Sequence, residues 1–265
     1  MSVLNSSGYL QKLFGLTDKT AIVIGGTGVL GGAIADALAQ AGAHVVIVGR
    51  NQENGDGRVQ VIKDLGGSAE FFKADSTSRE DLESLVAHLK SSSRVADILV
   101  NGAGINAATP FLEISDEEWE RIFRINLLSV KVACQVFGQS MLDQNIAGSI
   151  INIASMSAIT PLSRVFTYSA SKAAVLNLTQ NLAREWAECG IRVNALSPGF
   201  FPAEQNRKVL TPERTKSIMN HTPANRFGNP EELAGAVLML AAGHAGSFIT
   251  GTNIAVDGGF SCMTI

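Results

Sequence analysis

The sequence has 265 residues, of which 46% are hydrophobic and 17% charged, enough apolar material for one large buried core. A net charge of −3 argues against a nucleic-acid-binding protein, which would present a basic surface. The chain contains no apolar run near the roughly 18 residues that suggest a membrane span, and it does not begin like a signal peptide. We therefore expect a cytoplasmic protein that binds neither nucleic acid nor membrane. Its scattered cysteines and histidines predict no metal site.

Strand-like and helix-like segments alternate along the chain. A β-branched run at Thr20–Ile24 leads through a cluster of glycines into an Ala- and Leu-rich helical segment, Gly31–Ala41. The pattern then repeats, with strands predicted at His44–Val48, Ala69–Lys73, Asp97–Val100, Ser149–Ile153, Ile191–Leu196 and Thr252–Val256. Further helices are predicted at Arg79–Lys90, Ser115–Asp143, Tyr168–Glu188 and Pro230–Ala242, the second opened by a Ser115-Asp116-Glu117-Glu118 capping box.

This order predicts an α/β fold. Strands joined through helices form a mostly parallel sheet of seven strands covered on both faces, a doubly wound (Rossmann) domain. The composition does not shift anywhere along the chain, so we expect residues 1–265 to form a single domain. The irregular stretch Gly199–Thr222 is the one long interruption, and we predict that it is a mobile flap over the substrate.

A glycine-rich turn, Gly25-Gly26-Thr27-Gly28-Val29-Leu30-Gly31-Gly32, follows the first predicted strand. Within it, Gly26-x-Gly28-x-x-Gly31 matches a dinucleotide fingerprint. Glycines let the backbone turn tightly and approach a pyrophosphate, which the N-terminus of the following helix favours. A simple turn would also explain the glycines, but their place between strand and helix favours a dinucleotide. We expect it to be held by Gly25, Thr27, Gly28, Leu30 and Gly31.

The second predicted strand ends at Val48-Gly49-Arg50-Asn51. A carboxylate here would bond the ribose hydroxyls of NAD and repel a 2′-phosphate. The chain instead has Arg50, a fixed cation suited to a phosphate. We therefore predict NADP as the preferred cofactor over NAD, with Arg50 and Asn51 at the ribose. The alternative is that Arg50 is a solvated surface residue.

Tyr168 and Lys172 open an Ala-rich helix at a spacing that puts them on one face, one turn apart. Hydride transfer to a carbonyl needs a proton donor, and a nearby ammonium is expected to lower the pKa of the phenol for this task. Ser155 follows a predicted strand and can donate to the same substrate oxygen. Asn126, inside the long predicted helix, has an amide that can hold a water linking Lys172 to solvent; a purely structural role is the alternative.

With these residues in view, the chain resembles the short-chain dehydrogenase/reductase family from about Phe14 to Phe260. Further matching motifs are Asp75, Asn101-Gly102-Ala103-Gly104, Pro198-Gly199 and Val256-Asp257-Gly258-Gly259. The resemblance implies that Tyr168 is the catalytic acid/base, that Lys172 tunes it and binds the nicotinamide ribose, that Ser155 holds the substrate oxygen, and that Asn126 holds the water relay. It also implies cofactor contacts at Asp75, Ser76, Asn101, Gly102, Ala103, Gly104, Pro198, Gly199 and Phe201.

More closely, the chain looks like bacterial D-mannonate oxidoreductases (fructuronate reductases), through Gln135-Val136-Phe137-Gly138 and Pro198-Gly199-Phe200-Phe201 among other stretches. We therefore expect a small polar substrate, a secondary alcohol or ketone such as the keto-sugar acid fructuronate. The side chains expected to contact it are Asn106, Arg164, Gln205, Asn206 and Arg207. The alternative for the two arginines is that they are solvated loop charges.

Two other functions remain open. A 3-oxoacyl thioester reductase would need a basic surface for its carrier, and a nucleotide-binding regulator would not need the catalytic side chains. The predicted helices 115–143 and 168–188 carry apolar residues around much of their circumference, which is typical of burial on a second side. In the family that side is a helix-pair interface, so the resemblance implies a homotetramer.

Overall fold

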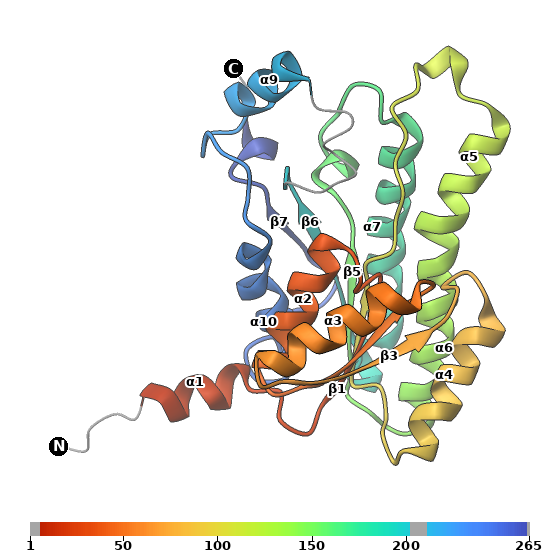
Figure 1. Ribbon diagram of the computed structural model, residues 1–265, viewed down its shortest axis with the longest axis vertical. Coiled ribbons are helices and arrows are strands. Elements are labelled where there is room, and N and C mark those ends of the chain that lie inside the picture. The colour runs from red at the N-terminus through yellow and green to blue at the C-terminus, as the bar shows by residue number, and fades with distance from the viewer. Residues whose placement is uncertain (1–5, 202–210, 264–265) are drawn as a thin grey trace.

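The structure is a computed structural model that describes residues 6–201 and 211–263. Its described residues contain a seven-stranded, all-parallel sheet in the order β3-β2-β1-β4-β5-β6-β7 (Figure 1). The strands are β1 (Thr20–Ile24), β2 (His44–Gly49), β3 (Ser68–Lys73), β4 (Ile98–Asn101), β5 (Ser149–Ile153), β6 (Arg192–Pro198) and β7 (Asn253–Val256). The predicted α/β fold with a parallel seven-stranded sheet is confirmed.

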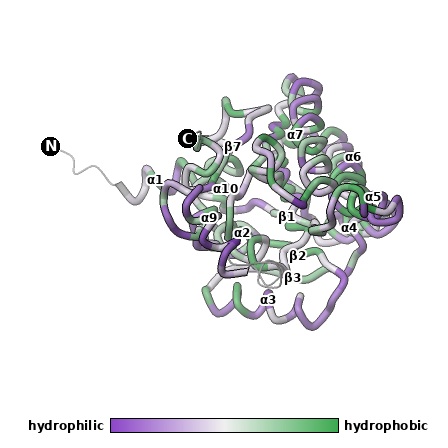
Figure 2. The backbone as a smooth tube through the Cα atoms, turned by 90° about the horizontal axis from the view of Figure 1, so that it is seen from above, coloured by the Kyte–Doolittle hydropathy of each residue, from purple (hydrophilic) through white to green (hydrophobic). Residues whose placement is uncertain are grey.

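Helices cover both faces of the sheet (Figures 1 and 2). One face is covered by α2 (Val29–Gln40), α3 (Gln52–Asp64) and α10 (Ala234–Ala241). The other is covered by α4 (Arg79–Ser91), α6 (Ser129–Asp143) and α7 (Phe166–Trp186). Because the chain changes face after crossing the sheet, the carboxyl ends of β1 and β4 flank a crevice, where such folds bind ligands.

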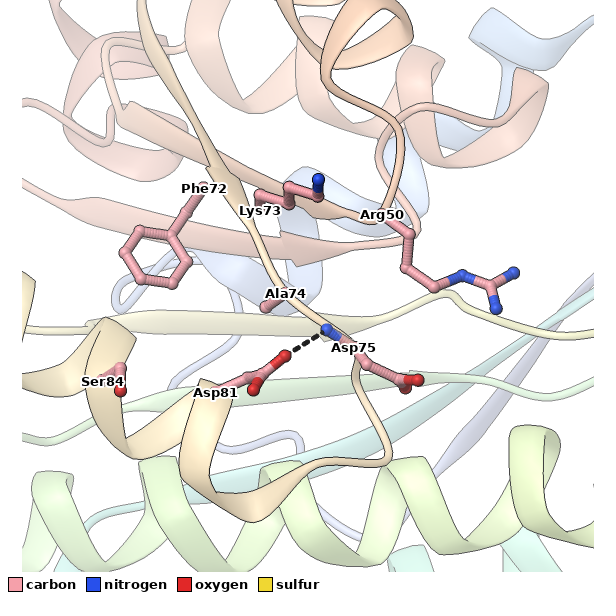
Figure 3. Close-up of a pocket in the computed structure, with 7 residues that line it drawn as sticks. All are labelled: Arg50, Phe72, Lys73, Ala74, Asp75, Asp81 and Ser84. Atoms are coloured by element: carbon pink, nitrogen blue, oxygen red, sulfur yellow. Dashed lines mark hydrogen bonds between the residues drawn. The ribbon is translucent and has the colours of Figure 1, made fainter.

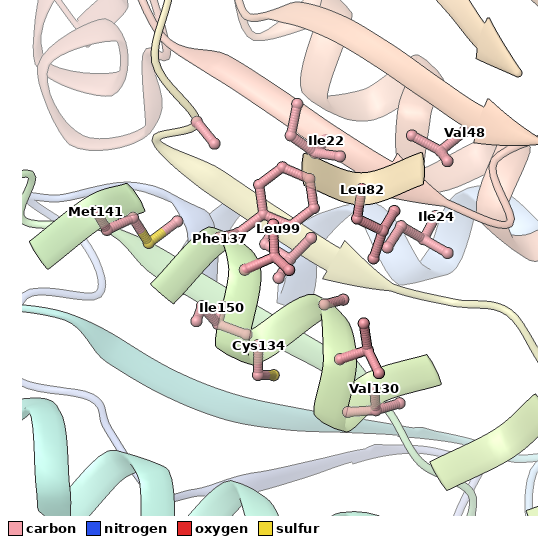
Figure 4. Packing of buried hydrophobic residues seen from close by; sticks show 14 of the residues in the cluster. Ile22, Ile24, Val48, Leu82, Leu99, Val130, Cys134, Phe137, Met141 and Ile150 are labelled. Carbon is pink, nitrogen blue, oxygen red and sulfur yellow. The ribbon is translucent and has the colours of Figure 1, made fainter. Parts of the chain in front are cut away.

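Alternate side chains of the central strands enter two separate cores. Ile22 and Ile24 of β1 pack into the core under α4 and α6, whereas Ala21 and Val23 pack into the core under α2 and α10. In the first core the Phe137 ring of α6 lies against Ile22 and Leu99 (Figure 4). Burial on both faces explains why β1 is almost entirely apolar, and why polar residues in the neighbouring strands, such as Asn101 and Asn152, bond to each other inside the protein.

The predicted continuous helix 115–143 is wrong in one respect. The chain forms α5 (Asp116–Phe123), then a π-helical turn at Arg124–Leu128, then α6. The extra residue of a π turn shifts the helix register, and such turns occur often at functional sites. Only half of the predicted capping box forms: Ser115 accepts from the Glu118 backbone, while the Glu118 carboxylate accepts from Thr109.

The predicted irregular stretch 199–222 is also partly wrong, because Pro212–His221 forms helix α9, capped by Thr211. Residues 202–210 lie outside the described part of the chain. Two further helices were not predicted, α1 (Ser6–Phe14) and α3. In the described part of the chain, no helix combines the length and apolarity needed to cross a bilayer.

Candidate active site

The glycine turn after β1 is packed too tightly for side chains. Gly25 has φ +79°, and a Cβ there would lie 2.8 Å from the Ala103 backbone nitrogen. A Cβ on Gly31 would overlap the Gly25 carbonyl oxygen. Gly28 differs, since its φ of −80° suits any residue and a Cβ there would make only an ordinary contact, 3.5 Å from the Gly25 carbonyl oxygen. The geometry of the turn therefore requires glycine at positions 25 and 31, whereas position 28 would accept a small side chain in this structure.

The first turn of α2 suits a bound pyrophosphate. No side chain caps the helix at Gly28, so its first backbone N–H groups, including those of Val29 and Leu30, are available to an anion. Thr27 lies beside Gly49, at the end of β2. These residues fit the phosphate half of a nicotinamide dinucleotide.

Arg50 and Asp75 lie together at a pocket beside the end of β2 (Figure 3). A backbone hydrogen bond from Thr77 lowers the pKa of Asp75, and the charges of Arg50 and Arg124 lower it further. The Asp75 backbone donates to Asp81, which fixes the loop containing Ser76. Asn51 instead caps α3, because its side chain accepts from the Asn54 backbone at 2.9 Å. The pocket therefore contains two exposed cations, Arg50 and Lys73, beside the carboxylates of Asp75 and Asp81.

The loop after β4 joins the glycine turn to the catalytic residues. Gly102 and Ala103 pack against Gly25, and a Cβ on Gly104 would lie 3.5 Å from Lys172 Nζ. The Asn101 side chain points into the protein, where it donates to Asn152 at 2.8 Å. Asn101 therefore joins β4 to β5, while its neighbours line the crevice.

Helix α7 supplies Tyr168 and Lys172 to this crevice. The Lys172 ammonium is 5.8 Å from the centroid of the Tyr168 ring and donates to the Ile153 carbonyl, at the end of β5, at 2.7 Å. Ser155 follows β5, and its hydroxyl is hydrogen-bonded to the Tyr168 phenol. The structure therefore brings Ser155, Tyr168 and Lys172 together, as the sequence predicts.

The pKa of Tyr168 differs from the expected direction. Burial raises it above its ordinary value, and the Ser155 hydrogen bond offsets only part of that increase. The ammonium that was expected to lower it is itself buried, which lowers the pKa of Lys172 to about 8. The protein alone thus favours a protonated phenol.

Asn126 lies in the π turn, fully buried. Its Oδ1 accepts from the Ile105 backbone N–H at 2.8 Å, and its amide group donates to the Ile105 carbonyl and to Ser171. Both amide hydrogens are used within the protein, so the expected water bridge cannot come from them. Ser171, which the sequence interpretation missed, donates onward to the Tyr168 carbonyl. The sequence could have indicated Ser171, because it lies three residues after Tyr168 and therefore on the same face of the helix.

The expected substrate contacts are only partly described. Arg164 is exposed, in a left-handed conformation with φ 65°, and Asn106 is exposed with its side chain bonded to the Ala107 backbone. Gln205, Asn206 and Arg207 lie outside the described residues. Arg214 of α9, which the sequence interpretation missed, approaches the Ser163 carbonyl at 3.5 Å, which places a cation beside the loop between Ser155 and Tyr168.

The segment after β6 is held by aromatic contacts. Pro198 ends β6, the Gly199 backbone donates to Val256, and Phe201 is buried against Gly228. The Phe260 ring, near the carboxyl end of the chain, lies 5.2 Å from Phe200 and 4.6 Å from His221 of α9, between centroids. The end of the chain thus supports both sides of the predicted flap.

This arrangement of glycine turn, serine and Tyr168/Lys172 pair defines an oxidoreductase that uses a nicotinamide cofactor. A family model described as Enoyl-(Acyl carrier protein) reductase matches residues 27–261. The chain belongs to the short-chain dehydrogenase/reductase family, and it is an NAD(P)-dependent enzyme of that family.

Similar proteins include sugar-acid enzymes. The chain is 37% identical to UxuB of Bacillus subtilis, an uncharacterized oxidoreductase, over 92% of this chain and 95% of that protein. It matches a gluconate 5-dehydrogenase from Burkholderia cenocepacia, in complex with NADP and tartrate, with TM-score 0.91 and 31% identity over 96% of this chain and 99% of that one. It also matches a Haemophilus structure with bound NAD, provisionally assigned as a D-mannonate oxidoreductase, with TM-score 0.88 and 33% identity over 94% and 97% of the two chains.

Proposed function

We propose that this protein interconverts a secondary alcohol and a ketone on a small polar substrate, a keto-sugar acid such as fructuronate being the candidate, with NADP preferred over NAD. The convergence of Ser155, Tyr168 and Lys172 beside the Gly25–Gly104 crevice carries the proposal. The fold and the family are common to many activities, so the substrate is argued from the side chains around this site.

The role of each catalytic residue follows from where the proton goes in the reaction. The nicotinamide, when bound, supplies or accepts hydride at the substrate carbon. Tyr168 gives its phenolic proton to the substrate oxygen in ketone reduction and takes it back in alcohol oxidation. Ser155 donates a hydrogen bond to the same oxygen, which stabilises the negative charge that develops there.

Lys172 acts on the Tyr168 phenol through its charge. Its ammonium, held by the Ile153 carbonyl, stabilises the phenolate that forms when Tyr168 loses its proton. With the pKa of Lys172 at about 8, its charge at neutral pH is sensitive to nearby groups. Asn126 keeps the Ile105 loop and the start of α7 in register, so that this geometry is maintained.

A carboxylate-bearing substrate is favoured by the charges near the crevice. Arg164 lies on the loop between Ser155 and Tyr168, Arg214 approaches the same loop at the Ser163 carbonyl, and both are cations able to hold a carboxylate. The relatives above include a gluconate 5-dehydrogenase whose structure holds tartrate, a hydroxy-dicarboxylate. We propose that Gln205, Asn206 and Arg207 complete the substrate contacts.

A substrate panel tests the proposal. D-fructuronate, related keto-acids, uncharged ketoses and acetoacetyl-CoA are each offered with NADPH and with NADH, and the nicotinamide absorbance is followed. We expect the highest kcat/KM with a keto-sugar acid and NADPH. Equal turnover of uncharged ketoses would contradict a keto-sugar acid as the substrate. A preference for acetoacetyl-CoA would favour a 3-oxoacyl thioester reductase instead.

A homotetramer in the cytoplasm is the assembly and location we propose. The assembly is supported by an exposed apolar patch of Phe111, Leu112 and Phe166. Leu112 is 96% exposed, and the ring centroids of Phe111 and Phe166 are 5.3 Å apart. The apolar residues of α6 and α7 that first suggested association are mostly packed within the chain itself.

A further inference from the structure

We propose that Ser157 is a positioning residue for the reaction: it holds the Ser155 hydroxyl so that the proton of Ser155 points at the Tyr168 phenol and the substrate oxygen. The inference rests on the proposed roles of Ser155 and Tyr168. Neither the sequence pattern nor the family resemblance assigns Ser157 a task.

Residue 157 makes two hydrogen bonds to the same oxygen. Its backbone N–H lies 3.2 Å from Ser155 Oγ, and its hydroxyl lies 3.0 Å from the same atom. Both serines are buried, in the short helical turn that follows β5. A buried arrangement of this kind is fixed, because water does not compete for the bonds.

A hydroxyl has one hydrogen to donate and two lone pairs that accept. A backbone N–H can only donate, so it occupies one lone pair of Ser155 Oγ, and the Ser157 hydroxyl occupies the other. Ser155 then has no acceptor site left for a third group. Its single hydrogen is therefore committed to donation on the side facing Tyr168, where a Ser155–Tyr168 hydrogen bond is present.

This orientation matters because the reaction needs Ser155 as a donor in both directions. A Ser155 hydroxyl free to accept would take a hydrogen bond from the neutral phenol, which stabilises the proton that Tyr168 must lose before it can act as the base in alcohol oxidation. Ser157 removes that option. The charged Lys172 ammonium lies 5.8 Å from the centroid of the Tyr168 ring. Because changes at position 157 leave it in place, its effect on the phenol cancels in a comparison of variants.

The chain offers a direct measurement that needs no substrate. It has two tyrosines, Tyr9 and Tyr168, and Tyr9 is 63% exposed on α1. In a Tyr9→Phe background Tyr168 is the single tyrosine, so its ionisation is followed by tyrosinate absorbance or by NMR of labelled tyrosine. We expect Ser157→Ala to raise the pKa of Tyr168 by about half a unit, the size of one lost neutral hydrogen bond.

In turnover the same change should lower kcat for alcohol oxidation at neutral pH about threefold, the factor that corresponds to half a pH unit, with KM nearly unchanged. The pH profile of kcat should move upward by the same amount. Ser157→Thr keeps the hydroxyl and should restore both values. If Ser157→Ala fails to fold, Ser157→Cys keeps the volume with a weaker donor, and the upward shift is expected there.

Two controls separate this role from general destabilisation. Ser140→Ala removes another buried hydroxyl, on α6, which bonds to Gln144, and should leave the pKa of Tyr168 unchanged. In a Ser155→Ala background, Ser157→Ala should have no effect on the titration, because its action passes through Ser155.

Three results would overturn the inference. A downward shift would mean that Ser155 donates to Ser157 instead, and that removing Ser157 frees the proton. An unchanged pKa of Tyr168 in Ser157→Ala would mean that Ser157 only packs in the core. The same conclusion would follow if Ser157→Ala shifted this pKa equally in the Ser155→Ala background. Because the titration requires neither cofactor nor substrate, it gives an answer even if the proposed substrate is wrong.

Discussion

Tyr168 is the residue on which the proposed chemistry depends most directly. Tyr168→Phe removes one oxygen and keeps the ring that packs beside Lys172. We expect turnover to fall by about 10²- to 10⁴-fold, the usual contribution of a general acid–base group. Cofactor affinity, measured by quenching of protein fluorescence, should stay within a few-fold of wild type. Retained turnover would rule out Tyr168 as the proton donor.

Lys172 connects catalysis to stability. Burial lowers its pKa from 10.5 to about 8, so between these two values the unfolded chain binds more protons than the folded one. The free energy of unfolding contributed by this group therefore rises with pH across that window, and its cost is fully present below it.

Lys172→Met removes this dependence. The difference in Tm between the wild type and this variant should shift in favour of the wild type as the pH rises from about 7 to about 9.5. Lys131→Met, a change at an exposed lysine of α6, serves as the control and should show no such trend. Parallel curves for wild type and Lys172→Met would mean that the ammonium is well solvated.

Arg50 is expected to decide between the two cofactors. It is exposed near Asp75, at the pocket beside the end of β2 (Figure 3). Arg50→Ala should raise KM for NADPH by about tenfold, the value of one charge-assisted hydrogen bond, and change KM for NADH by less than twofold. A loss that is equal for both cofactors would assign Arg50 to a part that they share.

Helix α3 shows how an element can be hidden from its sequence. It contains Gly55 and Gly57, which usually argue against a helix interior. Gly55 is needed because a Cβ there would overlap the Phe71 ring of β3. Tertiary packing therefore overrides local propensity, and the sequence alone does not reveal the partner.

The two glycines make a matched pair of variants. Gly55→Ala should destabilise the protein by about 1–3 kcal/mol through overpacking. Gly57→Ala meets nothing within 4 Å and should stabilise it by about 0.5–1 kcal/mol. Thermal unfolding of both variants checks the difference, and equal effects would show that Phe71 moves aside freely.

The strands and the catalytic face of α7 were predictable because their signals are local. Buried β-branched runs specify the strands, and the Tyr168–Lys172 spacing specifies a shared helix face. The π turn was not predictable, because the pattern around Asn126 continues as an ordinary helix on both sides. The pKa direction of Tyr168 was missed for a similar reason: burial depends on the whole fold, whereas the neighbouring ammonium can be read from four residues.

At the scale of the whole molecule, helices cover both faces of the sheet, and β3 and β7 are its two edge strands (Figure 1). The patch of Phe111, Leu112 and Phe166 is the apolar surface we expect a second copy to cover. Leu112→Asp should shift the mass measured by light scattering toward the monomer, since a charge there has no partner to pair with.

Leu65→Asp, at an exposed leucine after α3, is the matched control and should leave the mass unchanged. A wild-type protein that is monomeric in light scattering would contradict the proposed tetramer outright.

The contact of Phe260 with Phe200 and His221 has a practical consequence. Any peptide fused to the carboxyl end starts shortly after a ring that props up α9 and the segment following β6. Helix α1, by contrast, projects from the opposite end of the molecule (Figure 1). An affinity tag for purification and immobilisation therefore belongs at the amino end, where it leaves the substrate entrance clear.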